Sequence, residues 1–119
     1  MAWSPEVRRR LKPAGGIAAL SREAEQGMTQ VYQSNDGALL VAVRREPVDF
    51  VVVAAAGRGL ARHSGAIVAL ARQSGAARLR FHTRHPGRVA NTIRRWPIRL
   101  TETRRRGLAT EYVYHMELR

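Results

Sequence analysis

Residues 51–83 constrain the fold of this chain more than any other stretch. An apolar β-branched run, Val51–Val53, leads into the glycine turn Gly57–Gly59, a segment of helical periodicity follows, and residues 78–83 alternate apolar and polar side chains. This order of strand, turn, helix and strand is typical of an α/β domain. The turn also brings backbone N–H groups to the start of a helix, a place suited to an anion such as a pyrophosphate.

The helix after the turn is predicted over residues 60–74. Its apolar stripe consists of Leu60, Ile67, Leu70 and Ala71, which follow one another at helical spacing. We expect Ile67 and Leu70 to be buried against the sheet. A large-to-small change at Leu70 should then cost about 2–5 kcal/mol of stability.

The first 37 residues leave alternatives open. Ser4-Pro5-Glu6 has the pattern of a helix start, with serine as the N-cap and proline in the first turn, but Val7–Leu11 could also form a short edge strand. From Ile17 to about Gln33 apolar residues fall at helical spacing and predict one amphipathic helix, which Gly27 loosens or splits.

Alternation and turn residues predict the remaining elements. Strands are expected at Ala38–Arg45 and Val48–Ala56, joined as a hairpin at Glu46-Pro47. The later elements are a short helix from His85-Pro86-Gly87, a strand at Ile98–Thr103, a turn at Arg104–Gly107 and a strand at Leu108–Leu118. We therefore predict one α/β domain, residues 1–119, with a mixed sheet of five to seven strands.

The charge is large and uneven. The net charge is +12, and residues 60–119 account for +10 of it. Such asymmetry favours a polyanionic partner, either nucleic acid or an acidic protein surface. Because 20 of the 21 basic residues are arginine, translation of a GC-rich genome explains the same excess. The candidate contact residues are Arg78, Arg80, Arg84, Arg88, Arg94, Arg95, Arg99, Arg104, Arg105 and Arg106.

Several classes of protein are disfavoured. The chain has no cysteine for disulfides or thiolate chemistry, no apolar run of the ~18 residues that span a membrane, and no secretory leader pattern at its start. A Walker phosphate loop and a nucleophile elbow are also missing. The four histidines lack metal-ligand spacing, so we expect no metal, and we expect His82 and His85 at a solvated strand end.

The order of elements, with a glycine turn after a central strand, resembles the GNAT acetyltransferase superfamily. The likeness covers residues 38–118 and, more loosely, the chain from Val7. VRRRLKPAGGIAAL resembles the first strand and the beginning of the first helix of that family, and ARQSGAARLRFHT resembles the end of its cofactor-side helix and the next strand. The stretch from Arg80 to Gly87 resembles an RFHT-R-x-PG segment of short GNAT-like proteins from tailed bacteriophages. The resemblance implies a mixed, mostly antiparallel sheet flanked by helices.

The acyl-CoA loop of that family follows Q/R-x-x-G-x-G/A, and only its glycines are kept here. With the glycines on Gly57 and Gly59, Ala54 stands at the Gln/Arg position, and a shift of two residues puts Ala56 there. A tight turn between a strand and a helix explains the same glycines. The resemblance implies that acetyl-CoA, where it binds, places its pyrophosphate on the N–H groups of Gly57, Arg58, Gly59, Leu60 and Ala61.

The chemical positions of a second motif are lost. Against N-x-x-A-x-x-L-Y, Ala90 and Ile93 match the packing positions, whereas Gly87 replaces the Asn and Arg94 replaces the Tyr that protonates the departing thiolate in many members. Arginine is a permanent cation and a poor proton donor. No catalytic residue is therefore assigned.

Glu46 and Asp49 lie at the hairpin, near where the family often places its general base. Both also have a simpler interpretation as turn carboxylates.

Three functions follow as hypotheses. The first is a phage-type GNAT-fold protein without acetyl transfer, a structural or accessory component in the bacterial host cytoplasm or the virion, with phage structural proteins as partners and no cofactor. The second is a working acetyltransferase that uses acetyl-CoA and an unknown amine. The third is a basic nucleic-acid-binding module.

Overall fold

The structure is a computed structural model that describes residues 1–89 and 96–118. Its centre is a six-stranded sheet in the order β1-β2-β3-β4-β6-β5. Only β3 and β4 pair in parallel, and the other four pairs are antiparallel. The mixed, mostly antiparallel α/β sheet predicted from the sequence is therefore confirmed. The strands are β1 (Gln30–Gln33), β2 (Leu39–Arg45), β3 (Asp49–Gly57), β4 (Arg78–Thr83), β5 (Arg99–Arg106) and β6 (Ala109–Glu117).

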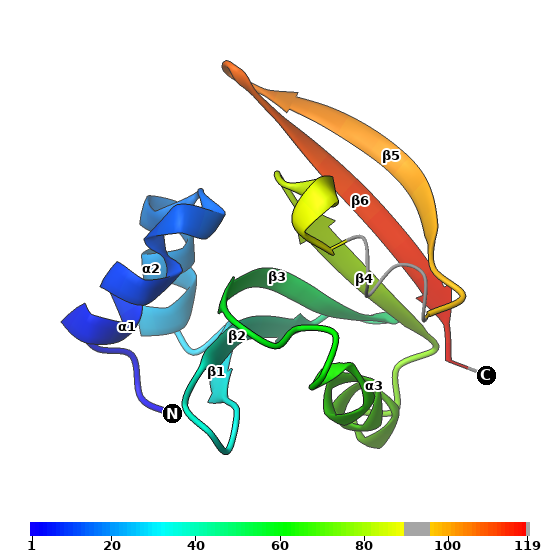
Figure 1. The fold of residues 1–119 in the computed structure, drawn as a ribbon, viewed down its shortest axis with the longest axis horizontal. Helices are drawn as coiled ribbons and strands as arrows, with labels where there is room; N and C mark the ends of the chain where they lie inside the picture. The colour runs from blue at the N-terminus through cyan, green and yellow to red at the C-terminus, as the bar shows by residue number, and fades with distance from the viewer. Residues whose placement is uncertain (90–95, 119) are drawn as a thin grey trace.

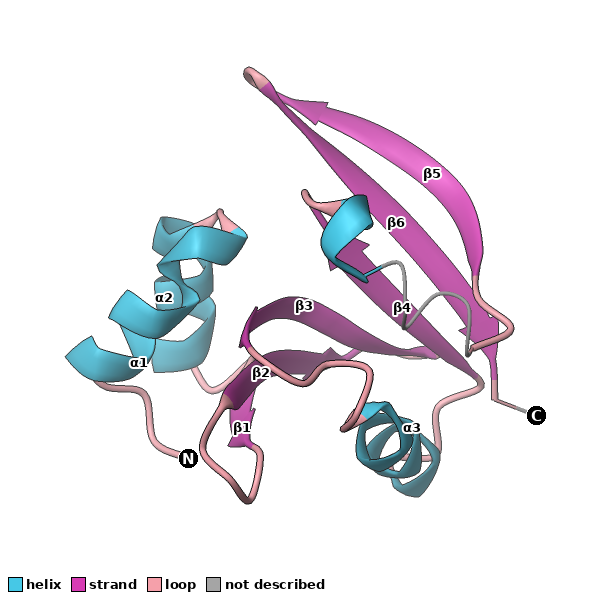
Figure 2. Ribbon diagram, viewed as in Figure 1, coloured by secondary structure: helices cyan, strands magenta, loops and turns pink. Residues whose placement is uncertain are grey.

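Helices cover both faces of the sheet (Figure 1). On one face α1 (Pro5–Leu11), the short 3-10 turn η1 (Lys12–Ala14) and α2 (Ile17–Glu25) bury their apolar residues against β1, β2 and β3. On the other face α3 (Ser64–Gln73) packs over the middle of the sheet, in a core that continues to β6. The turn end of the long β5–β6 hairpin lies away from α1, α2 and α3, as Figure 2 shows.

The N-terminal segment is a helix, so the strand alternative for Val7–Leu11 is wrong. The backbone N–H of Val7 donates to Oγ of Ser4 at 3.2 Å, an N-terminal cap. Val7 and Leu11 lie one turn apart and are both buried, with 3% and 0% exposure. One buried stripe is what a helix produces, whereas the family resemblance placed the first strand here.

The single helix predicted from Ile17 to Gln33 is also wrong. Helix α2 ends at Glu25, and Val31 lies in edge strand β1 opposite Ala42 of β2. Val31 is buried, with 4% exposure. Val31 continues the helical spacing of the apolar residues in α2 by coincidence. It is apolar because its position in the edge strand is buried, and not because the helix continues.

The later elements differ from the prediction at their ends. Helix α3 begins at Ser64 rather than Leu60, and Ile67 is buried, but Leu70 is only partly buried. The predicted turn at Arg104–Gly107 is mostly strand, since pairing of β5 with β6 continues to Arg106. After β4 the structure describes a 3-10 turn, η2 (Pro86–Val89), and Ala90, Ile93, Arg94 and Arg95 lie outside the described residues.

Candidate functional site

The parallel strands β3 and β4 separate along their length and leave a cleft, here called the β3–β4 cleft. Their pairing runs from Asp49 opposite Arg78 to Val52 opposite Phe81, after which β3 continues to Gly57 and β4 to Thr83. The register of β2 with β3 shifts at the same point. The neighbouring residues Ala42 and Val43 of β2 pair with Ala54 and Val52 of β3, so one residue of β3 is skipped. A bulge of this kind bends a strand away from its neighbour. The separation is visible in Figure 1.

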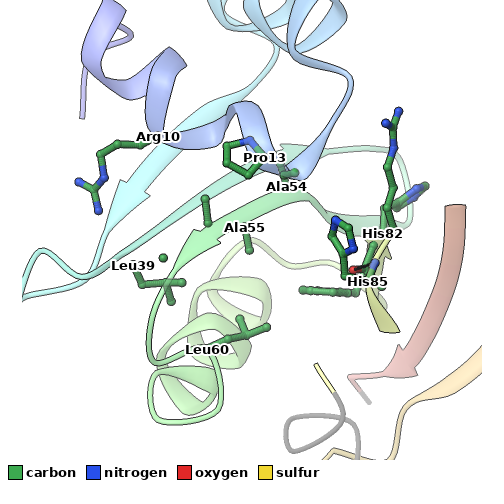
Figure 3. A pocket seen from close by; sticks show the side chains of 14 residues that line it. Arg10, Pro13, Leu39, Ala54, Ala55, Leu60, His82 and His85 are labelled. Atoms are coloured by element: carbon green, nitrogen blue, oxygen red, sulfur yellow. Dashed lines mark hydrogen bonds between the residues drawn. The ribbon is translucent and has the colours of Figure 1, made fainter. Parts of the chain in front are cut away.

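A cavity of about 330 Å³ opens in this cleft, between the turn that precedes α3 and the α1–η1 layer. Small and apolar side chains form one wall, among them Leu39, Ala55 and Leu60, and His82 and His85 stand on the opposite wall (Figure 3). The remaining lining residues are Arg10, Pro13, Ala14, Ala54, Ala56, Gly57, Phe81, Thr83 and Arg84.

The glycine turn lies at the rim of this cavity. At Gly57 φ is 109°, and a Cβ would lie 2.0 Å from the carbonyl oxygen of Ala38, so only glycine fits. The N–H of Arg58 donates to that same oxygen at 3.0 Å. Gly57 and Arg58 therefore serve the turn itself, which is the alternative that the sequence offered for these glycines.

Four consecutive N–H groups after the turn have no acceptor in the described part of the chain. They belong to Gly59, Leu60, Ala61 and Arg62, directly before α3. Gly59, Leu60 and Ala61 were among the predicted cofactor-binding residues. Arg62 was not among them, although the N–H groups in the first turn of a helix that begins at Leu60 would also lack acceptors.

A second cavity, of about 280 Å³, opens on the α1–α2 side of the cleft. Gly15, Gly16 and Leu20 contribute to it from the helical layer. The two cavities meet at the cleft because they share five lining residues, namely Ala14, Ala54, His82, Thr83 and Arg84. A ligand on either face of the sheet can therefore reach the same place.

Solved structures with the same arrangement are acetyltransferases. The ribosomal-protein-S18-alanine N-acetyltransferase of Escherichia coli superposes with a TM-score of 0.70 at 10% identity, covering 99% of this chain and 92% of that one. A protein of Desulfovibrio desulfuricans assigned to the GNAT family of acetyltransferases gives 0.61 at 14% identity, with 98% and 95% covered. This chain has the GNAT fold. No family model and no curated protein matches the sequence.

On the α1–α2 side of this GNAT-fold cleft, Arg80 is the centre of a charged network. Its Nη1 donates to Oδ2 of Asp49 at 3.1 Å, its Nη2 to Oε2 of Glu46 at 2.9 Å, and its Nε to Nε2 of His82 at 3.0 Å. The carboxylate of Asp49, only 6% exposed, also accepts two hydrogen bonds from Arg78, at 2.8 and 3.3 Å. The β2–β3 hairpin and β4 are thereby joined at one guanidinium.

Arg44 extends the network toward α2. Its Nη2 lies 2.8 Å from Oε2 of Glu46, and its Nη1 lies 2.5 Å from Oε1 of Glu23. Burial raises the pKa of Glu46, but the hydrogen bond from Arg44 and the charges of Arg80 and Arg44 outweigh it and leave the pKa below its usual value. A carboxylate stabilised as an anion in this way is a weak general base.

His82 is enclosed in the network and not solvated, so that expectation is wrong for it. Its side chain is 11% exposed, and Nδ1 lies 2.8 Å from Oε1 of Glu111. Since Nε2 accepts from Arg80, Nδ1 carries the proton and donates to Glu111. Burial lowers the pKa of His82, the charges of Arg80 and Arg104 add to that effect, and Glu111 opposes it. His85, in contrast, is exposed.

The arginines singled out in the sequence have different environments. Arg78 and Arg80 are paired with Asp49, and Arg104 is paired with Glu102 at 2.7 Å. Arg99 and Arg105 are exposed on β5, and Arg84 lines the cleft. The side chains of Arg88 and Arg106 are not described, and Arg94 and Arg95 lie outside the described residues. Nucleic-acid or acidic-partner binding stays a prediction.

No group of three or more His, Cys, Asp or Glu side chains within residues 1–89 and 96–118 could hold a metal ion. In the same residues no helix is both long and apolar enough to cross a membrane. The phage resemblance and a place in a virion stay predictions.

Proposed function

We propose that this chain binds an acyl-CoA thioester, acetyl-CoA being the simplest, in the β3–β4 cleft, and that acyl transfer from it is no faster than the uncatalysed reaction. The observation that carries the first part is the run of N–H groups at Gly59–Arg62, which lack acceptors among the described residues and lie beside a cavity with one apolar wall. Consecutive N–H groups before a helix are a favourable site for a pyrophosphate.

The surroundings of these donors fit such a cofactor. The exposed side chains of Arg58 and Arg62 place positive charge near the same turn. Leu39, Ala55 and Leu60 form an apolar wall against which the pantetheine arm can pack. When bound, the thioester would supply an activated acyl group.

The second part of the proposal follows from the other side of the cleft. Transfer to an amine needs a group that takes the amine proton. Glu46 and Asp49 are held by arginines, and the lone pair of His82 Nε2 accepts the N–H of Arg80. These groups therefore stabilise each other, and none of the three is available to an incoming amine. The work of the protein is then binding, as expected of an accessory component.

A calorimetric titration with acetyl-CoA tests the first part. Ala55→Leu fills the cavity of about 330 Å³ without altering the glycine turn. It should weaken acetyl-CoA binding at least tenfold, about 1.4 kcal/mol. Ala69→Leu makes the same chemical change on the exposed surface of α3 and should bind as the wild type does. Absence of binding at millimolar cofactor, or unchanged affinity in Ala55→Leu, contradicts the cofactor site.

A thiol-release assay tests the second part. Wild-type protein with acetyl-CoA and polyamines, peptide N-termini or aminoglycosides should release thiol at the background rate. Clear turnover that disappears in Ala55→Leu but persists in Ala69→Leu would show a working acetyltransferase and overturn this part alone.

A further inference from the structure

Arg84 holds an unusual position at the meeting point of the two cavities. It follows the last residue of β4, is half-buried, and lines both cavities. Its guanidinium rests on Gly15, in the loop between η1 and α2, where a Cβ would lie 2.4 Å from Cζ and 2.5 Å from Nη1 of Arg84. Because Gly15 belongs to the α1–α2 layer, the charged group lies against that layer.

The other arginines of that cavity have anionic partners. Arg44 is paired with Glu23 and Glu46, Arg80 with Glu46 and Asp49, and Arg104 with Glu102. Within residues 1–89 and 96–118, Arg84 makes no hydrogen bond or ion pair. A guanidinium offers five donors in a planar fork that matches a carboxylate or a phosphate. A half-buried one without a partner has given up part of its hydration, and a bound anion compensates for that loss.

We propose that Arg84 binds the carboxylate or phosphate of a small amine that enters the cleft from the α1–α2 side. This inference rests on the proposed function, because it places the amine opposite a bound acyl-CoA. The proposed donors for the cofactor's pyrophosphate are separate from Arg84, because Gly59–Arg62 do not line the second cavity, whereas the guanidinium of Arg84 lies against Gly15. A cavity of about 280 Å³ suits a small molecule better than a polymer.

Matched pairs of amines test this assignment by NMR titration of the full chain with saturating coenzyme A. Glycylglycine is compared with glycylglycinamide, and phosphoethanolamine with ethanolamine, so that each pair differs in its anionic group. The anionic member of at least one pair should bind at least tenfold more tightly and shift the amide signals of Gly15 and Arg84. The pair that shows the preference distinguishes a carboxylate from a phosphate.

Two variants assign the preference to one side chain. Arg84→Gln should abolish it, while Arg72→Gln, an equal charge change on the exposed surface of α3, should keep it. Equal binding within both pairs, no binding by any of the four amines, or a preference that survives Arg84→Gln overturns the assignment.

The affinity for coenzyme A, measured on the same samples, separates this inference from the proposed function. If coenzyme A does not bind while the anion preference and its loss in Arg84→Gln are observed, the proposed function fails and the role of Arg84 stands. Binding of coenzyme A without any preference refutes the role of Arg84 alone.

Discussion

The two sides of the β3–β4 cleft are built from different chemistry. On the α3 side, backbone N–H groups at Gly59–Arg62 lie beside small and apolar side chains. On the α1–α2 side, charged side chains such as Arg80 and Glu111 line the cavity, and most of them bind each other. A backbone donor persists whatever side chain its residue carries, whereas an acid or base disappears with one substitution. The loss of the Gln/Arg side chain at Ala54, in the acyl-CoA loop motif of the GNAT superfamily, therefore leaves the backbone N–H donors in place.

The charged side of the cleft stabilises the fold. Asp49 begins β3 and joins Arg78 and Arg80 of β4 at the place where the two strands still pair. Its carboxylate is 6% exposed, so its charge depends on those partners and not on water. The same contacts that hold the strands together occupy the groups that could have acted as bases.

The largest expected effect is at Asp49. Asp49→Asn should lower the free energy of unfolding by about 3–5 kcal/mol, because it removes a buried charge that pairs with both Arg78 and Arg80 and leaves Arg80 only Glu46 as an anionic partner among the described residues. Glu102→Gln is the matched control: its carboxylate is 48% exposed and paired only with Arg104 in the described part of the chain, so the change should have little effect on stability. Urea denaturation measures both. Equal costs would contradict a structural role for the network.

On the α3 side, stability should depend on packing instead. Ile67→Ala should cost about 2–5 kcal/mol, because Ile67 is 3% exposed at the centre of the core under α3. Leu70→Ala should cost less, since Leu70 is only partly buried. The same denaturation experiment ranks them, and a greater loss for Leu70 would show that the position of α3 on the sheet is wrong.

The smallest effect concerns His82 and pH. Its pKa in the folded chain lies below the value of about 6.5 expected when unfolded, so the unfolded chain binds more protons in that interval. The free energy of unfolding should therefore fall as pH decreases through 6.5 toward the folded pKa, and level off above 6.5. His82→Gln should flatten this slope between pH 7.5 and 5.5. Burial also lowers the pKa of His115, so a smaller slope of the same sign remains.

His85→Gln is the control for that experiment, since His85 is exposed. It should keep the wild-type slope. A wild-type stability that is flat over this interval, or an unchanged slope in His82→Gln, would show that His82 is not held neutral by its surroundings.

Periodicity predicted the central elements well. The hairpin of β2 and β3, the strand β4 and the strand β6 were found close to their predicted bounds, because each has alternating or continuous apolar residues between turn residues. The predictions were wrong where one sequence pattern is compatible with two different structures. Val31 continues the helical spacing of α2 but belongs to an edge strand, and Arg104–Arg106 have the composition of a turn but pair with β6.

The sequence by itself determined an α/β domain with a glycine turn between a buried strand and a helix, since both depend on local periodicity and backbone freedom. Only the tertiary structure decided which groups are free to act. Asp49 and Arg80 are 31 residues apart and meet because β3 and β4 pair in parallel, and Gly15 and Arg84 meet because the α1–α2 layer covers the cleft. Composition shows an excess of arginine, but pairing in space decides which arginine lacks an anion.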